Sequence, residues 1–244
     1  TYYLNVHCYI TNNNVTKVDL NYNSSFDFFI EHKEQKTYFI ADKIETSKQT
    51  VKTILKSKKF TPKDIQKSID GRFIVINLKK NSITIFSDKL GRTDLFYSKE
   101  KNKYIFSTVI NDFSPLKYDD DLGIINFFML YGSRAPKRQT LFSKIKRLGV
   151  CDVLSLKKQL DVKTNYINLK NYKNHSQNEY NKLFLNALEK RGNKDLNIVY
   201  LSSGWDSTSI LGGLAHIFGK DKVIALTSRA THSKRAGTHN IYEV

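Results

Sequence analysis

Cysteine, methionine, tryptophan and proline are all scarce in this sequence of 244 residues, with two, one, one and three residues respectively. The two cysteines, Cys8 and Cys151, lie far apart, and neither has a second cysteine or a histidine at the spacing of a metal site. Neither a disulfide framework nor a zinc site is therefore expected, which fits a reducing compartment. The six histidines form no HxxxH or HExxH pattern, so they predict no metal centre.

Long apolar runs are also missing. The longest, Ile124–Tyr131, is interrupted by Asn126 and is too short to cross a bilayer. The first residues, Thr1-Tyr2-Tyr3, lack the basic and apolar segments of a signal peptide. We therefore expect a cytoplasmic protein that has no membrane partner.

Acidic residues are outnumbered: the sequence holds 40 Lys and Arg against 23 Asp and Glu, a net charge of +17. Such an excess invites a nucleic-acid partner. The lysines are interleaved with asparagine, serine and isoleucine rather than gathered with aromatic side chains, which favours a lysine-rich solvated surface. With 40% hydrophobic residues, the chain is globular and can bury one large or two modest cores. A basic binder of tRNA or another nucleic acid stays as an alternative function.

Residues 1–168 have the pattern of an antiparallel domain. From Tyr2 to Ile10, apolar and polar residues alternate with period two, as in a strand with one buried face. Helices are expected near Thr50–Ser57 and over Asp121–Tyr131. A third helix is expected to start at Thr61-Pro62, which supply a capping hydroxyl and a first-turn proline. Further strands are expected at Phe26–Ile30, Thr37–Ala41, Arg72–Leu78, Ser82–Ser87, Asp94–Tyr97, Tyr104–Thr108, Val153–Leu156 and Thr164–Ile167.

A second domain is expected over residues 176–244. The polar and patternless residues 169–175 predict a linker, and Ser176–Glu179 forms a capping box ahead of a helical pattern. Asn197–Leu201 and Val223–Thr227 are short apolar runs typical of buried strands, with a helix between them. Strand, helix and strand in this order predict a β-α-β unit with a parallel sheet.

The junction between the first of these strands and its helix carries the strongest functional signal. Its turn consists of small residues, followed by three residues expected as N-capping and first-turn residues of the helix: Ser202, Ser203 and Gly204, then Asp206, Ser207 and Thr208. Such a junction directs backbone N–H groups and the positive end of a helix at one spot, which suits a phosphate. On spacing alone, an ordinary turn before a helix explains the pattern equally well.

Leu201–Thr208, LSSGWDST, resembles the SGGxDS pyrophosphate loop of the ATP-pyrophosphatase family, in the LSGGxDSS form of asparagine synthetases. Ser203 stands where that family usually has its first glycine. Upstream segments are similar to the class II glutamine amidotransferase domains of asparagine synthetases: Asp70–Ile76 to NGxFAFAI, Phe86–Gly91 with Leu95–Tyr97 to RDxxGxxPLYY, Ile105–Thr108 to FASE, and Thr140–Gly149 to TLFxxIxxLxPG. In this common order, the segments cover most of residues 70–214.

The chain therefore resembles the asparagine synthetase-like family. The resemblance implies an α+β, Ntn-hydrolase-like amidotransferase domain of antiparallel sheet layers with helices over residues 1–168. It also implies the start of a parallel α/β ATP-pyrophosphatase domain, of the adenine nucleotide alpha hydrolase-like fold, over residues 176–244. Family synthetase domains continue through several more strands and helices, so we expect a fragment or a truncated paralogue.

The function implied by the resemblance is ATP-dependent amide-bond formation, with ATP and Mg²⁺ as cofactors. A carboxylate would attack the α-phosphorus, release pyrophosphate and form an acyl-AMP, which ammonia or an amine then opens. Asp206 would hold Mg²⁺ and orient the pyrophosphate, and adenine would lie against Leu201 and Thr227. The residues that the resemblance assigns to ATP are Leu201, Ser202, Ser203, Gly204, Asp206, Ser207, Thr208 and Thr227.

In asparagine synthetases, an N-terminal cysteine of the first domain releases ammonia from glutamine. Thr1 stands at the start of this sequence. It could act as a nucleophile with its own amine as the base, or it merely begins the first strand or follows a removed methionine. The SDxE segment of the family corresponds to Ser47–Thr50, which puts Lys48 where a carboxylate would bind the glutamine amino group. We therefore expect an inactive glutaminase.

Two other enzyme functions stay open beside this one. The first is a genuine glutamine-hydrolysing asparagine synthetase. The second is an enzyme like the β-lactam or lasso-peptide cyclases, in which the attacking amine belongs to the substrate itself.

Overall fold

A computed structural model describes residues 2–11, 14–32, 34–57, 61–116, 129, 138–142, 144–165 and 176–227. The chain divides into two compact units, Thr1–Asn168 and Leu169–Val244, called here the antiparallel unit and the parallel unit. Three expectations fall outside the described residues: the role of Thr1, the linker 169–175, and the helix over Asp121–Tyr131 apart from Met129. In the described part of the chain, no helix is long and apolar enough to cross a membrane.

The first sheet of the antiparallel unit has five strands in the order β2-β1-β8-β7-β9. Neighbouring strands run antiparallel, and β1 shows the expected alternation because Leu4, Val6 and Cys8 are buried. The strands are β1 (Tyr3–Thr11), β2 (Asn14–Asn23), β7 (Phe96–Glu100), β8 (Lys103–Ser107) and β9 (Lys146–Arg147). The sequence analysis missed β2, and it placed the start of β7 at Asp94, two residues too early.

The second sheet has six antiparallel strands in the order β11-β10-β6-β5-β4-β3. They are β3 (Phe26–His32), β4 (Gln35–Ile44), β5 (Gly71–Lys79), β6 (Ser82–Ser87), β10 (Asp152–Leu156) and β11 (Leu160–Thr164). The expected strand Thr164–Ile167 is wrong in position, because the turn after β10 pairs Leu160 with Leu156 and starts β11 four residues earlier.

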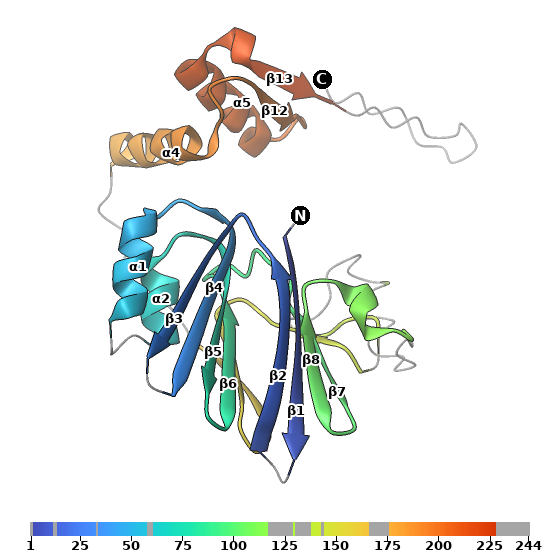
Figure 1. The fold of residues 1–244 in the computed structure, drawn as a ribbon. Helices are drawn as coiled ribbons and strands as arrows, with labels where there is room; N and C mark the ends of the chain where they lie inside the picture. The colour runs from blue at the N-terminus through green and yellow to red at the C-terminus, as the bar shows by residue number, and fades with distance from the viewer. Residues whose placement is uncertain are drawn as a thin grey trace, which may run out of the picture. The chain divides into compact units, whose positions relative to one another are not determined.

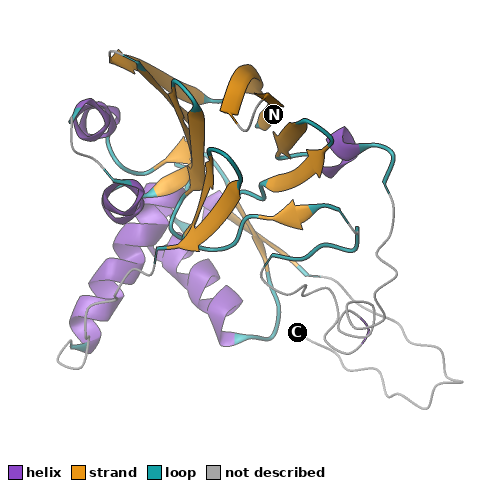
Figure 2. Ribbon diagram, turned by 90° about the horizontal axis from the view of Figure 1, so that it is seen from below, coloured by secondary structure: helices purple, strands orange, loops and turns teal. Residues whose placement is uncertain are grey.

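Two short helices cover the outer face of the six-stranded sheet, as Figures 1 and 2 show. The helix α1 (Lys48–Lys56) is capped by Ser47, and α2 (Pro62–Ser68) begins with a capping box between Thr61 and Asp64. The proline and the capping hydroxyl therefore start α2 as the sequence predicts. Their apolar side chains Val51, Leu55, Ile65 and Ile69 pack against Phe39, Phe73 and Val75 of the sheet.

The main core lies between the two sheets. Their inner faces contribute a layer of buried, mostly branched side chains, which includes Leu4, Val6, Ile40, Ile74, Ile76, Ile83, Ile85, Phe106 and Leu154. Cys8 lies in the same layer, and burial raises the pKa of its thiol to about 12. The thiol therefore stays neutral and unreactive at physiological pH.

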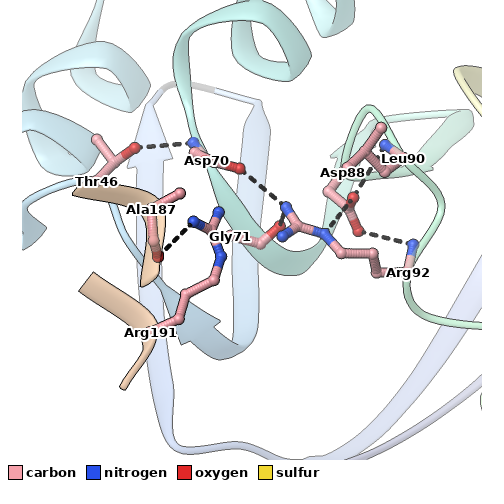
Figure 3. A network of polar contacts seen from close by, with 8 residues as sticks. All are labelled: Thr46, Asp70, Gly71, Asp88, Leu90, Arg92, Ala187 and Arg191. Carbon is pink, nitrogen blue, oxygen red and sulfur yellow. Dashed lines mark hydrogen bonds and ion pairs between the residues drawn. The ribbon is translucent and has the colours of Figure 1, made fainter. Parts of the chain in front are cut away.

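Two fully buried carboxylates tie the loops at the ends of this sandwich. Asp88 accepts hydrogen bonds from the backbone N–H of Leu90 (3.0 Å) and from the backbone N and Nε of Arg92 (3.2 and 3.1 Å). Nη2 of Arg92 continues the network to Asp70 (3.0 Å) and to the carbonyl of Gly71 (Figure 3). Gly71 is needed at its position, because a Cβ there would lie 2.8 Å from the carbonyl oxygen of Lys43.

Asp152 is the second buried carboxylate. Arg138 binds it with Nε and Nη2 at 2.8 and 3.0 Å, and it also accepts from the hydroxyl of Thr164 and the N–H of Gly149. This geometry is the paired, charge-assisted form that a carboxylate at 0% exposure requires.

The parallel unit has a β-α-β core. It contains α4 (Gln177–Arg191), β12 (Asn197–Tyr200), α5 (Trp205–Phe218) and β13 (Val223–Leu226). The capping box at Ser176 and Glu179 is confirmed. Strands β12 and β13 pair in parallel, with Asn197 opposite Val223, and Val199 and Leu214 are buried. The sequence pattern therefore predicts this local topology correctly.

The Asp152 network yields a stability prediction. Asp152→Asn replaces a fully buried carboxylate whose partner Arg138 is partly exposed, so the free energy of unfolding should fall by about 1.5–3 kcal/mol. The matched control is Asp161→Asn, whose partner Lys163 is exposed, and its cost should stay below about 1 kcal/mol. Urea unfolding followed by circular dichroism measures both. Equal losses in the two variants would contradict a structural role for the Asp152 pair.

Candidate functional site

The candidate site is the loop that joins β12 to α5. Beyond the last residue of β12, the N–H of Leu201 donates to the carbonyl of Leu226 at 2.7 Å, which extends the parallel pairing by one residue. Leu201 therefore lies beside the carboxyl end of β13, next to the exposed Thr227. The two residues assigned to the adenine side of the site are thus brought to one edge of the sheet. This is the edge at which parallel sheets bind ligands.

Ser207 closes the loop on itself. Its Oγ accepts from the N–H of Ser202 at 3.1 Å and lies 3.0 Å from the hydroxyl oxygen of Ser202. It also lies within donating distance of the carbonyls of Ser202 (3.1 Å) and Gly204 (3.2 Å). A serine hydroxyl carries a single proton, so it donates to one of these acceptors at a time. The Ser207 side chain is therefore part of the loop's own scaffold.

The helix cap differs from the sequence expectation. Helix α5 starts at Trp205 with Gly204 as its N-cap, and no side chain in the described part of the chain caps it. Asp206, Ser207 and Thr208 are first-turn residues and not caps, because Ser207 turns back to Ser202 while the Thr208 hydroxyl donates to the Gly204 carbonyl (3.0 Å). The expectation that one of them caps the helix is wrong.

This cap geometry leaves backbone donors for a ligand. The first N–H groups of an α-helix have no partner within the helix, and side chains usually satisfy some of them. The N–H of Gly204 donates to Oγ of Ser202 (3.2 Å) and the N–H of Thr208 donates to the carbonyl of Gly204 (3.3 Å). With glycine at the cap, no side chain in the described part of the chain caps the remaining N–H groups of the first turn, which lie at the positive end of the helix dipole. A Cβ at Gly204 would lie 3.2 Å from Oγ of Ser202, so a larger residue would crowd this turn.

Asp206 is the candidate magnesium ligand, and its side chain is exposed in the first turn of α5. The described residues contain no group of three or more His, Cys, Asp or Glu that could hold a metal by themselves. Mg²⁺ that enters with a nucleotide needs fewer protein ligands, because it keeps waters and is held by one or two carboxylates together with the phosphates. A single exposed aspartate fits this donor set.

Two exposed aromatic side chains flank the loop in sequence. Tyr200 at the end of β12 is 82% exposed, and Trp205 at the first position of α5 is 89% exposed. Trp205, at the variable position of the loop, is thus mostly exposed to solvent. It is also the one tryptophan of the sequence, so its fluorescence reports on this site alone.

The start of β1 holds a polar cluster that the sequence analysis missed. The hydroxyl of Tyr3, the side-chain amide of Asn5 and the hydroxyl of Ser107 all donate to Oδ2 of Asp112. Asp112 belongs to the 3-10 helix η1 (Ile110–Phe113), directly after β8. The alternation of β1 puts Tyr3 and Asn5 on one face, but only the pairing of β1 with β8 brings Asp112 to them.

The segment that corresponds to SDxE forms the start of α1. Ser47 caps the helix by accepting from the N–H of Thr50 at 3.1 Å. Lys48 is the first helical residue, and its ammonium lies over the ring of Phe26, 5.0 Å from the centroid. At the position where the SDxE segment has an aspartate, this chain has Lys48, whose ammonium contacts an aromatic ring.

The loop closure can be tested with one hydroxyl. Ser207→Ala removes the acceptor for the N–H of Ser202. The free energy that favours the closed loop over its open form should therefore fall by about 1 kcal/mol. Hydrogen exchange at residues 202–204, followed by mass spectrometry, should then accelerate roughly fivefold. The control is Ser209→Ala, because Ser209 is exposed on the same helix. Unchanged exchange in the Ser207 variant would mean that the hydroxyl does not hold the loop.

Comparisons with known proteins give distant matches only. No family model matches the sequence, and no curated protein does. Two similar solved structures are a glutamine phosphoribosylpyrophosphate (PRPP) amidotransferase from B. subtilis complexed with ADP and GMP, and a structure described as the allosteric regulatory enzyme of purine biosynthesis. Both are 10% identical, with TM-scores of 0.36 and 0.37. The alignments cover 91% and 92% of this chain but 59% of each neighbour, so the chain spans less than two thirds of their length.

Proposed function

We propose that the chain acts in ATP-dependent amide-bond formation, as an asparagine synthetase-like ligase that adenylates a carboxylate. One observation carries this proposal. The sequence LSSGWDST follows β12, the first of two parallel strands, and folds back on itself through Ser202 and Ser207, and α5 starts at Trp205 within it without a side-chain cap. The sequence of the segment and its local geometry both support a pyrophosphate site here.

The residues of the loop have separate tasks in this proposal. The uncapped N–H groups of the first turn of α5 bind the phosphates, assisted by the positive end of the helix. Ser202 and Ser207 hold the loop in shape, and Gly204 keeps its backbone accessible. Asp206 orients Mg²⁺, whose charge offsets the charge that develops on the leaving pyrophosphate. Leu201 and Thr227 line the adenine side.

The reaction proceeds in two steps. A carboxylate oxygen of the substrate attacks the α-phosphorus of ATP, and the bond to the bridging oxygen of pyrophosphate breaks. Ammonia or an amine then attacks the carbonyl carbon of the acyl-AMP, loses a proton and displaces AMP. The loop acts in the first step, because it binds the leaving group and so stabilises the transition state in which that charge appears.

The antiparallel unit is proposed to be a class II amidotransferase-like domain, of the Ntn-hydrolase type, that no longer hydrolyses glutamine. Two facing antiparallel sheets with helices on an outer face support this architecture. The ammonium of Lys48, which lies over Phe26, supports the loss of glutaminase activity. Its positive charge would repel the positively charged amino group of glutamine. Among ligases of this kind, that favours those in which the amine belongs to the substrate, as in the β-lactam and lasso-peptide cyclases.

Binding of magnesium and ATP is testable through Trp205. With excitation at 295 nm, titration of MgATP should change the fluorescence of the wild-type chain, and EDTA should weaken the binding. Asp206→Ala should raise the dissociation constant at least about tenfold, equivalent to about 1.4 kcal/mol.

The control for this titration is Asp221→Ala. Asp221 is also exposed but follows the opposite end of α5, where it pairs with Lys222 (3.8 Å). If both variants bind MgATP as tightly as the wild type, Asp206 is not a magnesium ligand.

The glutaminase prediction has a direct assay. Incubation of the purified chain with glutamine should release no glutamate above the buffer blank, as measured with coupled glutamate dehydrogenase. Release that Thr1→Ala abolishes would instead support a genuine glutamine-hydrolysing asparagine synthetase.

A further inference from the structure

The antiparallel unit contains a cavity that the proposed ligase function does not use. Its volume is about 740 Å³, and it lies on the outer face of the five-stranded sheet, between the β7–β8 hairpin, η1 and residues Phe142, Lys144 and Ile145. Sites for small molecules usually have volumes of about 300–1,000 Å³. The cavity is therefore large enough for a metabolite of two or three rings.

The floor of the cavity is apolar and well packed. Phe113 and Ile145 are 5% and 4% exposed and belong to a separate apolar cluster, which Phe142 joins. Tyr9 of β1 adds an aromatic wall. Buried walls of this kind keep their shape, so a flat apolar group can bind without first ordering the site.

The rim of the cavity is cationic. It carries four lysines, at positions 99, 101, 103 and 144, against one acidic residue, Glu100, which pairs with Lys103 at 3.2 Å. The ammonium of Lys99 lies 5.8 Å from the ring centroid of Tyr104. In the described part of the chain, Lys101 and Lys144 have no acidic partner. These two charges are available to a ligand.

The hairpin that presents Lys101 is held in place. Lys101 has φ 40°, in the left-handed region that residues with a Cβ rarely adopt. The N–H of Ile10 donates to the carbonyl of Asn102 at 2.7 Å, which anchors the tip of the hairpin to β1. The lysine is thus presented from a turn that the neighbouring strand fixes.

From the apolar floor and the cationic rim, we infer that this cavity binds a small aromatic anion, such as an aryl carboxylate or sulfonate. The rings lie against Phe113, Phe142 and Ile145, and the anionic group lies between the ammonium groups of Lys101 and Lys144. The apolar contacts supply most of the affinity, and the two lysines select the charge. Every lining residue of this cavity belongs to the antiparallel unit, whereas the loop between β12 and α5 belongs to the parallel unit.

Two fluorescent probes of similar ring size test this inference. The probe 1-anilinonaphthalene-8-sulfonate is anionic, and N-phenyl-1-naphthylamine is neutral. The anionic probe should bind the native chain, and the double variant Lys101→Glu/Lys144→Glu should weaken its binding at least tenfold. The same variant should change the affinity for the neutral probe less than threefold.

The matched control is Lys157→Glu/Lys158→Glu, which makes the same charge change in the exposed β10–β11 hairpin of the other sheet. It should leave the binding of the anionic probe unchanged. Phe142→Ala should weaken the binding of both probes, since it removes part of the floor. Circular dichroism verifies that each variant is folded.

Two outcomes would overturn the inference. In one, the anionic probe binds the Lys101/Lys144 variant as it binds the wild type, which places the probe on another apolar surface. In the other, the two double variants lose affinity equally, which reduces the effect to the net charge of the chain.

Discussion

The apolar layer between the two sheets is the constraint on which the antiparallel unit depends. In β4 and β5, successive residues are buried on opposite faces: Ile40 and Ile74 lie toward the other sheet, whereas Phe39 and Phe73 lie toward the helices. Along their central residues, both faces of these strands are apolar, and polar residues such as Gln35, Thr37 and Asn77 line a cavity near one end. Strands of the five-stranded sheet keep a polar or partly exposed outer face, and the Asp112 cluster and the cavity lie there. Burial therefore decides where a site can exist.

The buried carboxylates follow from the same constraint. Loops that close the ends of a sandwich must satisfy their backbone groups without entering its core. Asp88 does this for the turn before β7, and Asp152 does it for the turn before β10, each with an arginine that neutralises the charge. Asp88 and Gly91 belong to the segment that resembles RDxxGxxPLYY. In this chain, the side chains of that segment and of Arg92 bind backbone groups, among them the N–H of Leu90 and the carbonyl of Gly71, and so hold the loop in place (Figure 3).

Much of the local structure could be predicted from the sequence, because capping boxes and alternation are properties of a few consecutive residues. Thr61, Ser176 and the pattern of β1 are examples. Strand β2 was not expected because Val15 is its one buried residue, whereas Val18, Leu20 and Tyr22 pack against the core only partly buried. The shift of β11 and the role of Asp112 likewise depend on which strand pairs with which, and no short stretch of sequence encodes that choice.

The two candidate sites differ in the same way. The loop between β12 and α5 is formed by contacts within Leu201–Thr208 and by one bond to β13, so eight consecutive residues already contain most of its geometry. A local site of this kind can be recognised from the sequence. Its helix cap was predicted wrongly, because the hydroxyl of Ser207 contacts the hydroxyl of Ser202 and does not cap α5. The cavity brings together residues from positions 9 to 145, and no spacing rule relates them. Sites assembled by the packing of distant strands become recognisable only when the register of those strands is known.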